Sequence, residues 1–274
     1  MFRLKATIIS IGNELIQGRV VNTNASYLSR RLTLLGIDVV AHIVIGDNFD
    51  DVSKALDTAL RIFGSNIIIT TGGLGPTYDD ITSEAIARYL GEEYVINEEA
   101  LREVKEKYES RNMPLTPERI KMAYMPKSAK SLRNPVGIAP GFMISKDNFI
   151  IIALPGVPAE MEGIWESSVE PYLKRFSDRR IAETYIRLVG APESTLAAYI
   201  NRFVRGKNNV YVKTHPKGHE TRGPINDLYI MVSTSRETDP SEECFKICNE
   251  LIDILKKNIN DLIIEGECKC NRSL

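Results

Sequence analysis

Short apolar runs alternate with amphipathic helical patterns in the N-terminal third of the chain. Each run is followed by a segment whose apolar residues recur three or four positions apart, which is typical of a helix with one buried face. The expected strands are residues 4–11, 38–46 and 66–70, and the expected helices are residues 24–35, 49–63 and 81–90. Alternation of strand and helix predicts a parallel sheet covered by helices on both faces.

The pattern changes twice further along the chain. Between residues 92 and 142 it predicts two helices and a loop rich in proline and glycine, and two further strands then lead into the sequence PGVPAEMEGIW. After residue 177 the expected order is strand, helix, strand, strand, helix, which is typical of an α+β domain. The expected domains are a three-layer α/β/α domain over 1–177, a smaller α+β domain over 178–260, and a C-terminal tail over 261–274.

Composition places the chain among ordinary globular proteins. Its 274 residues are 43% hydrophobic and 26% charged, which is enough to build one large core or two smaller ones. The net charge of −1 provides no basic field for nucleic acid, so a nucleic-acid partner is not expected. No apolar stretch approaches the roughly 20 residues of a membrane helix, and the N-terminal sequence is a poor signal peptide. We therefore expect a cytoplasmic protein without a membrane partner.

A glycine-rich sequence, TTGGLGPTYDDIT at residues 70–82, follows the third expected strand. Loops at the carboxyl ends of parallel strands form the ligand-binding edge of open α/β sheets. Glycine allows positive φ and close approach of a ligand, and successive free N–H groups ahead of a helix bind anions. Pro76 and Thr77 stand where a P-loop requires lysine, and Tyr78 stands where the dinucleotide fingerprint requires glycine. The loop is therefore either a phosphate cradle of another kind or a purely structural turn.

Two carboxylates, Asp79 and Asp80, stand beside the expected cradle, where they would repel a phosphate unless a cation intervened. Mg²⁺ binds through one or two carboxylates together with phosphate oxygens, so the pair indicates a magnesium bridge. Alternatively one aspartate caps the helix. Asp47 follows the second strand and could approach Asp80, or could form a turn or cap ahead of the next helix. Asn22 and Asn24 follow the first strand and could reach the same ligand.

All four cysteines lie near the C-terminus. Cys244 and Cys248 are one helical turn apart, and Cys268 and Cys270 form a C-x-C pair. Four thiolates could bind zinc, although the spacing differs from that of paired C-x-x-C knuckles. The alternative is a reduced helix face and a frayed terminus. The two histidines of HPKGHETRG, residues 215–223, could belong to a zinc site or could lie in an exposed loop.

The ordered motifs resemble a known family. TTGGLGPTYDDIT resembles the T-T-G-G-x-G-P…D-x-T signature of the molybdopterin-binding domain superfamily, which includes molybdenum cofactor biosynthesis proteins. IGNELIQGRVVNTNASYLSRRLTLLGIDV, VIGDN, GGLGPTYDD and ALPGVPAEM are similar, in order, to the N-terminal part of the competence/damage-inducible CinA family. This resemblance covers about residues 4–170. The element order after Ser177 is similar to the KH-type domain that follows in CinA proteins.

The resemblance implies a three-layer α/β/α fold with its ligand at the edge of the glycine loop. It implies catalytic and metal-binding roles for Asp47 and Asp80. The residues expected to bind the ligand or its phosphates are Thr71, Gly72, Gly73, Gly75, Pro76, Thr77, Thr82, Glu14, Asn22, Asn24, Pro155, Gly156 and Pro158. Leu74 stands where relatives that adenylylate molybdopterin usually have threonine, and this departure argues against pterin specificity.

For this part of the CinA family the resemblance implies hydrolysis of a nucleotide diphosphate such as ADP-ribose, with Mg²⁺ or another divalent cation as cofactor. The alternative is a pterin- or nucleotide-binding protein without turnover, related to molybdenum cofactor biosynthesis, with molybdopterin as its ligand. Longer CinA proteins carry a C-terminal domain that deamidates nicotinamide mononucleotide, and we do not expect that activity here. Relatives are commonly oligomers, so a homo-oligomer is expected.

Overall fold

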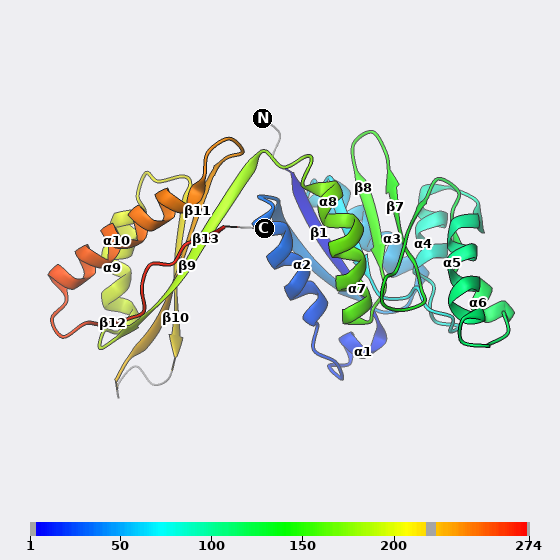
Figure 1. Cartoon of the computed structure of the whole chain (residues 1–274), viewed down its shortest axis with the longest axis horizontal. Helices are drawn as coiled ribbons and strands as arrows, with labels where there is room; N and C mark the ends of the chain where they lie inside the picture. The colour runs from blue at the N-terminus through cyan, green and yellow to red at the C-terminus, as the bar shows by residue number, and fades with distance from the viewer. Residues whose placement is uncertain (1–3, 218–222, 273–274) are drawn as a thin grey trace. The chain divides into compact units, whose positions relative to one another are not determined.

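The computed structural model describes residues 4–217 and 223–272, which form two compact units (Figure 1). The first unit contains the described residues up to 33 together with 37–176, and the second contains 34–36 and the described residues from 177 onward. Each unit has a hydrophobic core of its own, as a separate domain does.

A six-stranded sheet forms the centre of the first unit. Its strands are β1 (Lys5–Ile11), β2 (Asp38–Ile45), β3 (Ile67–Thr71), β6 (Lys130–Leu132), β7 (Gly141–Ser145) and β8 (Ile150–Leu154). They lie in the order β2-β1-β3-β8-β7-β6, in which the first four are parallel and the last two run antiparallel to their neighbours. The predicted parallel sheet is confirmed, and two antiparallel strands extend one edge.

Helices cover both faces of this sheet (Figure 1). The α-helices described in this unit are α1 (Asn13–Ile16), α2 (Thr23–Leu34), α3 (Phe49–Asp57), α4 (Thr82–Leu90), α5 (Glu98–Glu109), α6 (Pro117–Lys121), α7 (Pro158–Ile164) and α8 (Glu170–Leu173), of which α1 and α6 bury no residue. A separate two-stranded sheet contains β4 (Tyr94–Ile96) and β5 (Tyr124–Pro126). Side-chain caps fix helix starts: Asn48 accepts from the N–H of Asp50 (2.9 Å), and Asn97 accepts from that of Glu99 (3.1 Å). Gly91, at φ 66°, ends α4.

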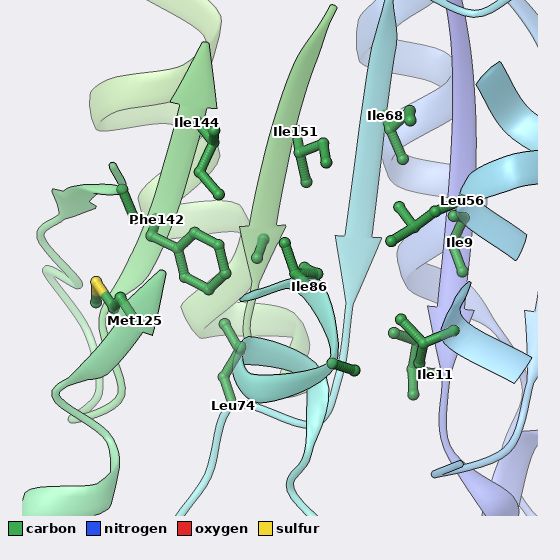
Figure 2. Packing of buried hydrophobic residues seen from close by; sticks show 14 of the residues in the cluster. Ile9, Ile11, Leu56, Ile68, Leu74, Ile86, Met125, Phe142, Ile144 and Ile151 are labelled. Carbon is green, nitrogen blue, oxygen red and sulfur yellow. The ribbon is translucent and has the colours of Figure 1, made fainter. Parts of the chain in front are cut away.

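The sheet strands are apolar because both of their faces are covered. Ile9, Ile68 and Ile151 project into one core with Leu56 of α3 and Ile86 of α4 (Figure 2), and all five side chains are fully buried. Burial of this extent holds the strand ends in place, and the loops that follow them start from fixed positions.

A partly buried ion pair between α2 and α8 joins two segments that are far apart in the sequence. Arg31 donates from Nε to Glu170 Oε2 at 2.8 Å, and the indole Nε1 of Trp165 donates to the same oxygen at 2.7 Å. The carboxylate is therefore shared by a cation and a neutral donor, which compensates for its removal from water.

The second unit is an antiparallel sheet with two helices. Its elements are β9 (Arg179–Val189), α9 (Glu193–Val204), β10 (Val210–Lys217), β11 (Ile225–Ser235), α10 (Pro240–Asn258), β12 (Ile263–Glu265) and β13 (Asn271–Arg272). The strand order is β10-β11-β9-β12, and β13 also pairs with β9. The α+β order predicted after residue 177 is confirmed. With β12 included it becomes β-α-β-β-α-β, the split βαβ arrangement, and the KH-like character of this unit stays a prediction.

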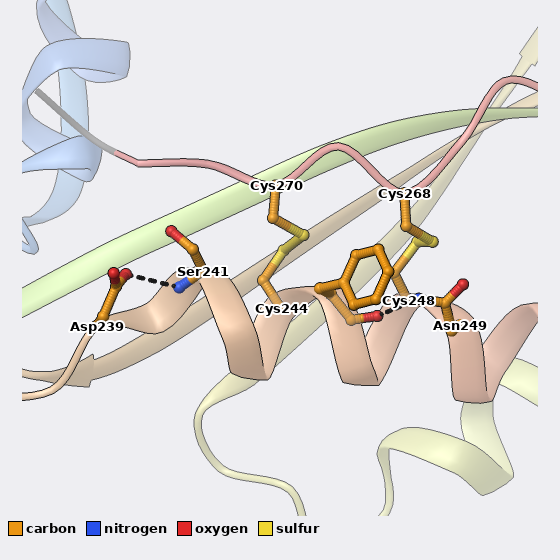
Figure 3. The surroundings of a disulfide bond; sticks show 8 residues. Asp239, Ser241, Cys244, Cys248, Asn249, Cys268 and Cys270 are labelled. Carbon is orange, nitrogen blue, oxygen red and sulfur yellow. Dashed lines mark hydrogen bonds between the residues drawn. A yellow bond between two sulfur atoms is a disulfide. The ribbon is translucent and has the colours of Figure 1, made fainter.

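The cysteines form two disulfides, so the expectation of either a zinc site or a reduced helix face with a frayed terminus is wrong (Figure 3). Cys244 pairs with Cys270 and Cys248 pairs with Cys268, each with Cα atoms 6.0 Å apart. Four residues of a helix rise about 6 Å, and two residues of an extended chain rise about 6.6 Å. The helical i, i+4 pair therefore matches the C-x-C pair when the terminal segment runs antiparallel to α10. Sequence spacing alone did not place these segments side by side.

Candidate functional site

A cavity of about 540 Å³ lies at the carboxyl ends of the parallel strands of the first unit. The loops that follow β1, β2, β3 and β8 form one part of its wall, and α5, Met122 and residues 137–139 form another. Its size is that of a small-molecule site. We call it the rim cavity.

Most of the residues expected at the site line the rim cavity. They are Glu14, Asp47, Gly72, Gly73, Gly75, Pro76, Thr77, Asp80, Pro155 and Gly156. Four others line a smaller adjoining cavity of about 80 Å³, namely Thr71, Asn22, Asn24 and Pro158. Thr82 is fully buried and lines neither of these cavities. The rim loops therefore converge as the strand order predicts, although not all of their polar side chains reach the same space.

The glycine loop presents unpaired amides to the rim cavity. Gly72 and Gly73 have φ values of 105° and 69°, which other residues rarely adopt. The N–H of Gly72 donates to the carbonyl of Leu154 at 3.0 Å. The next three N–H groups, of residues 73–75, have no hydrogen-bond partner in the described part of the chain. Three successive N–H donors without a protein partner, ahead of a helix, are an arrangement that can bind an anion.

Thr82, the first residue of α4, holds this loop in shape. Its Oγ1 donates to the carbonyl of Gly72 at 2.9 Å, and its N–H donates to the carbonyl of Gly73 at 3.1 Å. A Cβ on Gly73 would lie 2.2 Å from the Thr82 hydroxyl. Thr82 therefore supports the loop from behind, and Gly73 must be glycine for the two to pack.

Asp80 closes the far end of the loop. Its Oδ2 accepts from the N–H and Oγ1 of Thr77, at 2.8 and 2.6 Å. Helix α4 begins two residues later without a side-chain cap, so neither aspartate of the pair caps it. Asp79 is partly exposed, and its pKa is lowered by hydrogen bonds from the Thr77 hydroxyl and its own backbone N–H and by the charge of Lys121. Asp80 Oδ1 has no hydrogen-bond partner among the described residues.

Asp47 joins the loop after β2, in which it lies, to the loop after β1. Its Oδ2 accepts from the N–H of Asn13 at 2.9 Å, while Asn48 caps α3, so Asp47 is not the cap. Burial raises the pKa of Asp47, and the negative charges of Glu14, Asp79 and Asp80 raise it further. The carboxylates of three rim loops therefore share one electrostatic environment.

The carboxylates of the rim cavity could coordinate a divalent cation only if a bound ligand supplied further oxygens. Among the residues that the structure describes, no three histidine, cysteine or carboxylate side chains gather closely enough to hold an ion. Mg²⁺ requires only one or two carboxylates when phosphate oxygens complete its shell. Asp47 and Asp80, which face one cavity beside free amides, meet that requirement.

The two asparagines hold the rim together. Asn24 donates from Nδ2 to Thr71 Oγ1 (2.9 Å) and to the carbonyl of Gly156 (2.8 Å), and Thr71 donates to the carbonyl of Pro155 (3.0 Å). Asn22 accepts from the N–H of the residue three positions on at 3.1 Å, as a cap of α2. These bonds join the loops after β1 and β8 to the end of β3.

Sequence reasoning missed the opposite wall of the rim cavity. Its side chains come from α5 and the turn after it, the end of α6, the first turn of α7, and the proline- and glycine-rich loop that precedes β7. They are Tyr108, Arg111, Met122, Ile138, Ala139 and Glu160. The only signal was the composition of that loop, which indicated a turn and no ligand.

A mostly parallel sheet with a glycine loop and acidic neighbours at one rim defines the class of this domain as α/β, with a cavity at the carboxyl ends of its strands. Residues 7–175 match the family described as a probable molybdopterin binding domain, and the chain belongs to that family. A protein of Pyrobaculum arsenaticum is 45% identical over 252 residues, 92% of this chain and 94% of that one. A Metallosphaera sedula protein is 46% identical over 230 residues, 83% and 85% of the two chains.

The likeness extends to a solved structure. The protein CinA from Thermoplasma acidophilum, of unknown function, has a crystal structure and is 40% identical in sequence to this chain. The two structures superpose with a TM-score of 0.58. The match covers 62% of this chain and 98% of that one. Within the described ranges, this chain contains no helix with the length and apolar character needed to cross a lipid bilayer. His219 of the H-x₃-H pair lies outside the described residues.

Proposed function

We propose that the rim cavity binds a nucleotide diphosphate, such as ADP-ribose, and that the protein hydrolyses the diphosphate with a divalent cation as cofactor. The observation that carries this proposal is the meeting of free loop amides with carboxylates in one cavity. The N–H groups of residues 73–75 have no protein partner in the described chain, and Asp47 and Asp80 line the same space. A volume of about 540 Å³ suits a nucleotide-sized ligand.

In this proposal the chain binds the diphosphate from two sides. The loop amides donate to its oxygens, as such concavities do for phosphates. Arg111, on the opposite wall, adds positive charge to the same cavity. The ammonium group of Lys121 donates to the carbonyl of Thr77 and so adds a fixed cation beside the loop.

Asp47 and Asp80 are the residues that hold the cation. A bound divalent cation neutralises charge that develops on the phosphate oxygens and lowers the pKa of an attacking water. Thr77 and Asn13 orient the two carboxylates by hydrogen bonds to one oxygen of each. The other oxygen of each side chain is left for the cation.

Product analysis tests the proposal directly. Purified protein with ADP-ribose and Mg²⁺ is expected to release AMP, detected by chromatography. Asp80→Asn keeps an acceptor for Thr77 but removes the charge, and should lower the rate roughly a hundredfold or more. Asp147→Asn, an exposed carboxylate between β7 and β8, is the matched control and should leave the rate unchanged. A wild-type rate in Asp80→Asn would remove Asp80 from the mechanism.

The family description favours one other candidate, binding of a pterin without turnover. Calorimetry beside product chromatography separates the two. A ligand that binds tightly and is recovered intact in the presence of Mg²⁺, Mn²⁺ or Ca²⁺ would support the carrier and contradict hydrolysis.

A further inference from the structure

The wall of the rim cavity opposite the glycine loop is built around a buried asparagine. Asn134 is fully buried. Its Oδ1 accepts from the N–H groups of Val136 (3.0 Å) and Gly137 (2.8 Å). Its Nδ2 donates to the carbonyl of Ala139 (2.8 Å) and to Glu160 Oε2 (2.8 Å). All the hydrogen-bonding positions of the side-chain amide are therefore used within the protein.

The backbone of Asn134 is fixed as firmly as its side chain. Its N–H donates to Glu103 Oε1 at 2.8 Å, and its carbonyl accepts from Lys107 Nζ at 2.6 Å. Glu103 and Lys107 lie one turn apart on α5 and form an ion pair, with side-chain exposures of 8% and 18%. The loop before β7 is thereby attached to α5, and the position of Glu160 relative to the cavity is set by a rigid network.

Glu160 offers one unused acceptor to the cavity. It lies in the first turn of α7, and its Oε2 is held by Asn134. Its Oε1 has no hydrogen-bond partner within the described chain and lies against Gly137, where a Cβ would be only 1.9 Å away. A larger residue than glycine at that position would displace the carboxylate.

Apolar side chains line the same cavity as this acceptor. Tyr108, Met122 and Ala139 are at most 8% exposed, and Ile138 is half-buried. All four line the rim cavity together with Glu160. An oriented acceptor among apolar groups is the arrangement that recognises the polar edge of a planar heterocycle.

We propose that Glu160 selects the base of the ligand, by accepting a hydrogen bond from an exocyclic amino group. The inference rests on the proposed function, since it assigns the diphosphate to the glycine loop and the heterocycle to this wall. The substrate class is then a nucleoside diphosphate derivative whose base carries an amino group, as adenine does. A carboxylate can only accept, so hypoxanthine, which has an oxygen in place of that amino group, is disfavoured.

Substitution by glutamine should reverse the preference. The amide oxygen of Glu160→Gln accepts from Asn134, which leaves its NH₂ group facing the ligand. A donor at that point pairs with the oxygen of hypoxanthine and not with an amino group. Gly137 and the buried network are unchanged by this isosteric replacement, so the fold is retained.

Two non-hydrolysable probes test this in the presence of Mg²⁺, namely the α,β-methylene analogues of ADP and IDP. By calorimetry, wild-type protein should bind the adenine probe roughly ten- to a hundredfold more tightly, the range of a hydrogen bond to a charged group. Glu160→Gln should bind the hypoxanthine probe at least as tightly as the adenine probe. Glu162→Gln, on the same helix but outside the cavity lining, should retain the wild-type preference.

The outcomes separate this inference from the proposed hydrolysis. Base selection would be overturned if wild-type protein bound both probes with equal affinity. It would also be overturned if Glu160→Gln weakened the binding of both probes equally, a result that would place Glu160 beside the ribose. Selective binding without AMP release from ADP-ribose would uphold Glu160 and overturn the hydrolase. Binding of neither probe would overturn base selection by Glu160, whereas the hydrolase is overturned only if AMP is not released from ADP-ribose.

Discussion

Reduction of the two disulfides should destabilise the second unit and leave the first unit unaffected. Cys244–Cys270 and Cys248–Cys268 span 26 and 20 residues. In the chain-entropy model, one cross-link of that span raises the free energy of unfolding by about 3.5 kcal/mol at 25 °C. The second loop is nested inside the first and closes chain that is already constrained, so we expect about 4 kcal/mol for both together.

The single tryptophan makes this measurable in the intact chain. Trp165 is fully buried in the first unit, so its fluorescence follows the unfolding of that unit, whereas far-UV circular dichroism follows both. In guanidinium titrations, reductant should move the second unit's transition by about 1 M to lower denaturant, given typical m-values. The fluorescence transition should not move.

Replacement of the cysteines provides the control. The double variant Cys268→Ala with Cys270→Ala should match the reduced wild-type protein and should not respond to reductant. The reasoning is refuted if the wild-type circular-dichroism transition is the same with and without reductant. It is equally refuted if four thiols react in native, unreduced protein.

Three further predictions concern the rim. Gly72→Ala places a Cβ 2.1 Å from a β1 carbonyl oxygen, at a φ of 105°, and should lower the free energy of unfolding by roughly 3 kcal/mol. Gly64→Ala is the control, because its Cβ meets open space, and it should cost about 1 kcal/mol. Denaturant unfolding measures both. The pKa of Asp47 is raised in the folded protein, so its charged form is disfavoured there. The contribution of Asp47 to stability in EDTA should therefore fall as pH rises above about 4 through its folded pKa, so the free energy of unfolding of wild-type protein minus that of Asp47→Asn should fall over that range. A difference that does not change with pH would contradict the reasoning. Mg²⁺ should tighten binding of the methylene analogue of ADP at least roughly tenfold, and the analogue should tighten Mg²⁺ binding equally; equal affinity in EDTA would contradict a shared cation.

The regular elements could be predicted because their burial is periodic in the sequence. Helices such as α2 and α3 repeat apolar residues every three or four positions, and β3 is apolar throughout because both its faces are covered. The short elements were missed for the opposite reason. Strands β4 and β5 have three residues each, and β12 pairs with β9 far away in sequence. Their stability comes from partners that no local pattern reveals.

The candidate site also has one part that could be predicted from the sequence and one part that could not. The loops after β1, β2 and β3 lie at one rim because of the strand order, so the position of Asp47 and Asp80 on one cavity follows from the topology. The opposite wall comes from a segment without βα regularity, and its key residue, Asn134, acts through bonds to residues 26 and 31 positions away. The capping roles considered for the aspartates were wrong for a local reason. Asn48, and not Asp47, caps α3, and the carboxylate of Asp80 accepts from Thr77 instead of from the first turn of α4.

Some polar groups of the rim already have hydrogen-bond partners within the protein and others do not. The groups without partners indicate the chemistry of the expected ligand. Asn134 and Thr82 are buried and hydrogen-bonded to the chain, so they shape the cavity and have little left to offer a ligand. The atoms left over include the N–H groups of residues 73–75, one oxygen each of Asp47, Asp80 and Glu160, and the buried Oδ1 of Asn24. Donors are thus grouped on the glycine loop, next to the acceptors of the aspartate loops, with a further acceptor on the far wall. An anion alone would meet the donors but be repelled by the neighbouring carboxylates. A diphosphate bridged by a cation, with an amino-bearing base beyond it, satisfies all three sets at once.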